Sequence, residues 1–121
     1  MKQPGSDGRR WMGVARCGNS DSRTAAATAT TQALTGHEPK LLIVFFAITH
    51  DAAEVMAGVR QVAPDVPLIG CSTHGEIAPG GPTDGTVLVT AIGGPGISVS
   101  TSVAESVSGR QREAGAQIAQ C

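Results

Sequence analysis

The chain has 121 residues, which fits one domain, and 40% of them are hydrophobic, which is enough for a buried core. The net charge is −1 with nine scattered Lys and Arg residues, and only 2% of the residues are aromatic. Nucleic acid is therefore excluded as an expected partner, because there is no basic face for phosphates and no aromatic platform for bases. The core must be built mainly from Val, Ile, Leu and Ala.

The cysteines and the apolar runs indicate the cellular compartment and whether the chain contacts a membrane. Cys17, Cys71 and Cys121 are odd in number and far apart, which is typical neither of a disulfide framework nor of a zinc site. The longest apolar run, residues 41–48, is too short to span a bilayer. We therefore expect a cytoplasmic protein with no membrane contact, no metal and no cofactor.

The first half of the chain predicts alternating strands and helices. Residues 1–10 are polar and are expected to be a disordered tail, followed by a domain over residues 11–121. Residues 11–15 predict a short strand, and the Ala-rich residues 24–34 predict a helix that packs closely on its neighbour. Residues 41–48 are continuously apolar, which favours a strand covered by helices on both faces.

The second helix has the clearest pattern. Apolar residues recur at spacings of three and four between Ala52 and Ala63, and Asp51 with Glu54 forms a capping arrangement. Residues 66–71 predict the next strand. Because strand–helix–strand crossovers place their strands in parallel, we expect a βαβαβ start.

The remainder predicts a different arrangement. Residues 72–85 are expected to be a long Gly- and Pro-rich loop. Residues 86–92 and 97–103 predict a β-hairpin, and a final helix is expected to continue to Cys121. The expected fold class is thus α/β, with a mostly parallel or mixed sheet, a hairpin and a C-terminal helix. The unfinished helix suggests a domain truncated at its C-terminal end.

Polar residues gather where two expected strands end. Ligands of open parallel sheets bind beyond the carboxyl ends of the strands. The candidate ligand-binding residues are His50, Asp51, Gly70, Cys71, Ser72, Thr73, His74, Gly75 and Glu76. Each has an alternative structural role: Cys71 as a small buried residue, His50 bonded to backbone, Asp51 as a helix cap and Glu76 satisfying local N–H groups.

Residues 67–77, Pro-Leu-Ile-Gly-Cys-Ser-Thr-His-Gly-Glu-Ile, resemble the signature of the FIST N-terminal domain family. The resemblance covers most of residues 11–121, and His74 departs from it, since a small residue is expected there. It implies an intracellular sensory domain that binds small ligands such as amino acids in signal transduction. It also implies a C-terminal FIST half or a signalling output module as partner, and it supplies no catalytic residues.

Three functions remain open from the sequence. The leading one is a non-enzymatic sensory domain that binds a small carboxylate. The second is an enzyme with Cys71 as nucleophile and His74 or His50 as base. The third is a structural or partner-binding half-domain.

Overall fold

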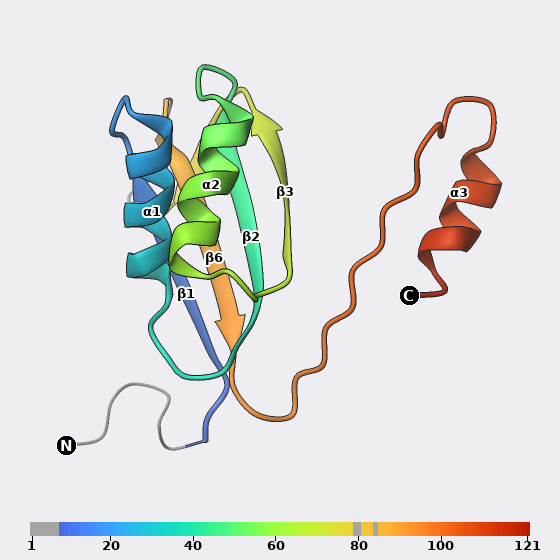
Figure 1. Cartoon of the computed structure of the whole chain (residues 1–121), viewed down its shortest axis with the longest axis horizontal. Helices are drawn as coiled ribbons and strands as arrows, with labels where there is room; N and C mark the ends of the chain where they lie inside the picture. Colours follow the sequence, from blue (N-terminus) through green and yellow to red (C-terminus); the bar gives the residue numbers. More distant parts are fainter. Residues whose placement is uncertain (1–7, 79–80, 84) are drawn as a thin grey trace.

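The computed structural model describes residues 8–78, 81–83 and 85–121. A four-stranded sheet with two helices packed on it forms the main body, and a third helix follows at the end of an extended segment (Figure 1). In chain order the elements are β1 (Trp11–Cys17), α1 (Ser22–Ala33), β2 (Pro39–Ala47), α2 (Ala52–Val62), β3 (Leu68–Thr73), β4 (Glu76–Ala78), β5 (Gly81–Thr83), β6 (Val87–Gly93) and α3 (Gln111–Ile118). Most of the expected N-terminal tail lies outside the described residues.

The large sheet is mixed. Its strand order is β1-β6-β2-β3, with β6 antiparallel to both β1 and β2, and with β2 parallel to β3. The three strands of the βαβαβ start therefore run in the same direction, as predicted. However, β6 separates the first two of them. The predicted α/β class with a mixed sheet is confirmed.

Both helices of the main body pack on one face of the sheet. The core lies between the two helices and the sheet. It consists of small and branched residues, mainly the alanines of α1 and Leu42, Val44, Val55, Val59, Val87 and Val89. The two helices approach each other closely at Gly58, where a Cβ atom would lie 2.3 Å from the carbonyl oxygen of Arg23. The predicted close packing of the Ala-rich helix is confirmed.

The expectation that helices cover both faces of residues 41–48 is wrong. Along β2, Leu42 and Val44 are buried under the helices, whereas Phe45 points to the opposite face and is 36% exposed. On that same face Met12 of β1 is 66% exposed and Ile69 of β3 is 46% exposed. An apolar run cannot distinguish a strand covered twice from one whose second face is left open, because both contain the same residue types.

The hairpin also differs from the prediction. Residues 97–103 form no strand, and run as extended chain away from β6. A hairpin is found instead inside the expected loop, where β4 pairs with β5. The last helix, α3, ends at Ile118 and does not continue to Cys121. In the described part of the chain, no helix is long and apolar enough to cross a membrane.

Candidate functional site

The carboxyl ends of β2 and β3 lie side by side, as the sequence predicts. The two strands are paired in register from Leu42 with Leu68 to Ala47 with Thr73. Just beyond the pairing, the N–H of Ile48 donates to the carbonyl oxygen of Thr73 at 3.1 Å. The candidate residues after β2 and those around the end of β3 are therefore at the same edge of the sheet.

Glu76 is the buried centre of this edge. It is only 2% exposed, and its carboxylate accepts hydrogen bonds from the hydroxyl of Thr73 and from both the hydroxyl and the N–H of Thr86. The bond from the Thr86 N–H measures 3.2 Å. A buried carboxylate is tolerated where donors surround it in this way. Glu76 thus joins the end of β3 to the start of β6.

His50 is the second anchor, and it is 8% exposed. Its Nε2 lies 2.9 Å from the carbonyl oxygen of Gly85, and its Nδ1 lies 2.9 Å from Ser22 Oγ. Because a carbonyl oxygen only accepts, Nε2 carries the proton, and in the neutral ring Nδ1 accepts from the Ser22 hydroxyl. Ser22 Oγ in turn accepts from the Asp51 N–H at 3.0 Å. His50 therefore connects the starts of both helices to the loop before β6.

Acidic side chains surround the starts of these helices. Asp51 is exposed, and its carboxylate caps α2 by accepting from the Glu54 N–H at 3.1 Å. Asp21 caps α1 in the same manner, accepting from the Thr24 N–H at 2.9 Å. The Thr24 hydroxyl, then the Thr24 N–H, and finally the charge of Arg23 hold the pKa of Asp21 below its ordinary value of 3.8. A salt bridge of 2.9 Å between Arg23 and Glu54 joins the two helices.

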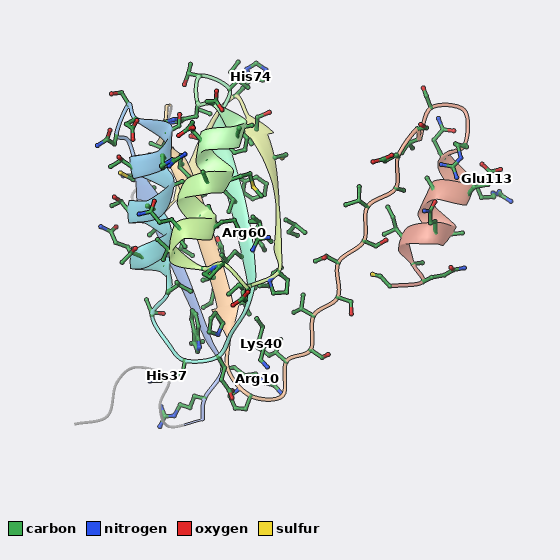
Figure 2. The ribbon with its side chains drawn as sticks, viewed as in Figure 1. Arg10, His37, Lys40, Arg60, His74 and Glu113 are labelled. Carbon is green, nitrogen blue, oxygen red and sulfur yellow. The ribbon has the colours of Figure 1, made fainter. Side chains whose placement is uncertain are left out.

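The rest of the signature segment is accessible. Cys71, Ser72, His74 and Gly75 are exposed, and Figure 2 shows His74 beyond the end of β3, directed away from the sheet. Cys71 pairs in register with Phe45 and so lies on the face opposite the helices. The structure does not bring this thiol near His50, which bonds to the start of α1 on the helix side.

Gly70 has a packing role of its own. A Cβ atom at this position would lie 1.9 Å from the carbonyl oxygen of Val44 on the neighbouring strand. Only glycine allows β2 and β3 to come this close.

Among the described residues, no group of three His, Cys, Asp or Glu side chains is arranged to hold a metal ion.

Three residues of this edge were not predicted from the sequence: Ser22, Gly85 and Thr86. Ser22 stood among several consecutive polar residues before the first helix, and nothing in that pattern points to His50. Thr86 carries a weak signal, because it is a polar residue immediately before an apolar strand. Its contact with Glu76 depends on β6 lying beside β2, which local sequence does not reveal.

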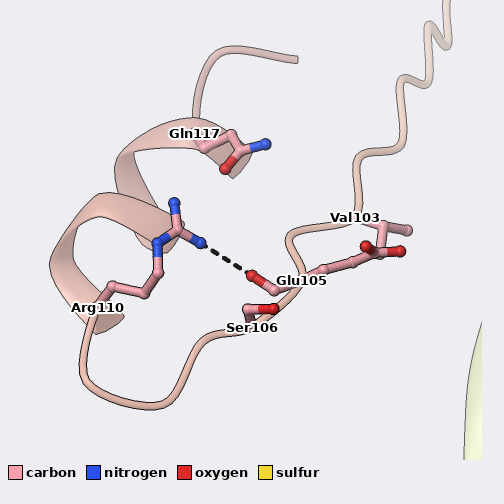
Figure 3. Close-up of a pocket in the computed structure, with 5 residues that line it drawn as sticks. All are labelled: Val103, Glu105, Ser106, Arg110 and Gln117. Carbon is pink, nitrogen blue, oxygen red and sulfur yellow. Dashed lines mark hydrogen bonds between the residues drawn. The ribbon is translucent and has the colours of Figure 1, made fainter.

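Other hollows lie on the described part of the molecule, and Val103 lines two of them. An apolar groove of about 300 Å³ lies between α2 and the outer strand β3, and its lining residues include Val44, Phe46, Met56, Leu68, Gly70 and Val103. A second hollow of about 460 Å³ lies between α3 and the segment before it (Figure 3). There the Arg110 guanidinium donates to the carbonyl oxygen of Glu105 at 2.9 Å.

The family model of the FIST N domain matches residues 40–121, which is most of the chain and includes the whole signature segment. No curated protein matches the chain. The matched region contains β2, α2 and β3 with their shared carboxyl-end edge, together with the buried Glu76. The chain therefore belongs to the FIST N domain family, a family of sensory domains in signal transduction.

Proposed function

We propose that this domain is an intracellular sensor that binds a small polar ligand carrying a carboxylate, such as an amino acid. The family is one of sensory domains and not of enzymes, which supports a binding role. The candidate site lies at the carboxyl ends of two parallel strands, which is where open α/β sheets bind small molecules. In this proposal the segment from Gly70 to Glu76 forms the floor of the site, with His50 and Asp51 on one wall.

The observation that carries the proposal is the way this segment is anchored. Glu76 is buried and holds Thr73 on one side and Thr86 on the other. Ser72 precedes the anchored Thr73, and His74 and Gly75 lie between Thr73 and Glu76, so in this proposal their donors are positioned before a ligand arrives. Binding to a pre-positioned site avoids the entropy cost of ordering a loop.

The chemistry of the exposed residues suits an amino acid. Ser72 offers a hydroxyl, and Gly75 has no side chain to keep a ligand carboxylate from the backbone N–H groups of the loop. Asp51 is exposed and offers negative charge to a ligand ammonium group. His50 acts through its position, because both of its ring nitrogens bond within the chain.

We further propose that the partner receiving the signal is a C-terminal FIST half or a signalling output module. Ligand binding changes a partner's state only if the ligand binds one arrangement of the two parts more tightly than another. The site is connected to both helix starts through His50, so a ligand there is well placed to favour one arrangement.

A thermal-shift and calorimetric screen of amino acids and small carboxylates tests the proposal. A ligand at about 100 times its Kd stabilises a protein by about 2.7 kcal/mol if it binds only the folded state. We expect Ser72→Ala to weaken binding and Ser98→Ala, a matched change of an exposed serine far along the chain, to leave it unchanged. Cys71→Ser should retain full affinity. Loss of binding in Cys71→Ser with the fold intact, or no stabilisation by any carboxylate, would contradict the proposal.

A further inference from the structure

The outer strand of the sheet has one side without a strand partner in the described residues. The large sheet ends at β3. On the side of β3 that faces β2, the carbonyl oxygen of Pro67 accepts from the Leu42 N–H at 2.9 Å. The carbonyl oxygen of Thr73 accepts from the Ile48 N–H at 3.1 Å. In a strand, the N–H and C=O of one residue point to one neighbouring strand, and those of the next residue point to the opposite side. The N–H groups that point toward the open side therefore belong to the residues between: Leu68, Gly70 and Ser72.

Residues 97–103 lie on this open side of the sheet. In Figure 1 the segment after β6 turns below the sheet and rises on the β3 side in the same direction as that strand, with a gap that widens toward α3. Val103 already lines the apolar groove together with Leu68, Ile69 and Gly70 of β3. Val103 thus connects the segment to the groove beside β3, although no strand pairing is formed between them.

The sequence of this segment has the pattern of a strand with one apolar face. Ile97, Val99, Thr101 and Val103 alternate with Ser98, Ser100 and Ser102. In a strand, side chains two residues apart share a face. If Val103 is directed into the groove, Ile97 and Val99 face the same side, and the three serines face the other.

The connection is long enough for pairing. A strand on the open side of β3 lies three strand spacings from β6, which is about 14 Å. Extended chain spans about 3.3 Å per residue, so the six steps from Gly93 to Val99 reach about 20 Å. Gly94 and Gly96 have φ of 107° and 78°, so the connecting residues already form the turn that such a path requires.

We propose that residues 97–103 pair with β3 as a fifth strand, parallel to it, and that Val103 then closes the apolar groove beside α2. Docking satisfies the outward N–H groups of β3 and buries Val103, which is 80% exposed when undocked. The segment lies within the region that the FIST N model matches, so it belongs to the domain. Because β3 lies within the signature segment, docking and release of this strand act directly on the strand that carries the candidate site.

Amide hydrogen exchange on the full chain, followed by NMR, tests the proposal. We expect the amides of Leu68, Gly70 and Ser72 to exchange about tenfold or more slowly than in the Val103→Asp variant, which places a charge in the groove. Ser102→Asp adds the same charge one residue earlier on the other face and should keep the slow exchange. Both side chains are exposed in the undocked state, so neither variant should prevent folding. The core amides of Val87 and Val89 provide the internal check.

Two results would overturn the proposal. Equal exchange of the three reporter amides in the unmodified chain and in Val103→Asp would show that the segment does not pair. Slow exchange that disappears on dilution, together with a dimer in sedimentation experiments, would show that a second copy covers this side. Neither measurement depends on a ligand, so failure here is separate from failure of the proposed sensor function.

Discussion

Ser22 Oγ lies 2.9 Å from His50 Nδ1, and this contact joins the first residue of α1 to the residue that precedes the cap of α2. The same hydroxyl accepts from the Asp51 N–H. Ser22 and His50 therefore help to fix the relative position of the two helix starts, together with the salt bridge between Arg23 and Glu54. The imidazole is structural here, since it also donates to Gly85 in the loop before β6.

A double-mutant cycle on this pair should show coupling. We expect Ser22→Ala and His50→Ala each to lower the free energy of unfolding, with a coupling energy of about 0.5–1.5 kcal/mol, because each change removes the same hydrogen bond. Urea denaturation of the four proteins measures it. His74→Ala is the control: this histidine is exposed, and its loss should change stability by less than about 0.5 kcal/mol. Additive effects would mean that the contact contributes nothing.

Glu76→Gln should destabilise the fold although the side chain keeps its size. The amide oxygen can still accept from Thr86, but the amide N–H group only donates, so the Thr73 hydroxyl must turn to accept and the bonds to a charged carboxylate become weaker neutral ones. We expect a loss of about 1–3 kcal/mol in the free energy of unfolding, measured by chemical denaturation. Glu113→Gln, the same change at an exposed position of α3, should have almost no effect. Equal stability of the two variants would rule out an anchoring role for Glu76.

Two glycines in helices should respond to alanine in opposite directions. At Gly58 a Cβ atom would meet the Arg23 carbonyl oxygen at 2.3 Å, so Gly58→Ala must separate α1 from α2 and should cost about 1–3 kcal/mol. At Gly115 nothing lies within 4 Å of the added Cβ, and alanine there should favour α3 by about 0.5–1 kcal/mol. Thermal and chemical unfolding measure the first change. Helix content by circular dichroism measures the second.

Asp21 should make the stability of the start of α1 depend on acidic pH. Its pKa in the folded state is below 3.8, chiefly because the Thr24 hydroxyl donates to the carboxylate. The stabilisation is therefore complete above pH 3.8, the ordinary value, and is lost as the pH falls through the lower folded-state pKa. NMR titration of the carboxyl carbon gives this pKa directly. Thr24→Val should raise it toward the ordinary value, and an unchanged titration would show that the hydroxyl is not the main cause.

Several features were predictable because their signals are local. The cap at Asp51, the acidic Glu54 and the apolar spacing over the following residues all lie within a few positions, and together they predicted α2. The apolar run of residues 41–48 predicted β2 for the same reason. The shared edge at the ends of β2 and β3 followed from a general rule, since a strand–helix–strand crossover places its two strands in parallel.

By itself, the sequence determined the elements of the main body, the parallel course of β1, β2 and β3, and the signature segment of the FIST N family. Only the tertiary structure decided that β6 lies between β1 and β2 and that both helices cover one face. The same holds for the contact of Glu76 with Thr86 and that of His50 with Ser22, 28 residues apart. Helix and cap signals come from residues within one or two turns. Strand order and side-chain contacts between elements depend on how all elements pack together, and no short stretch of sequence contains that information.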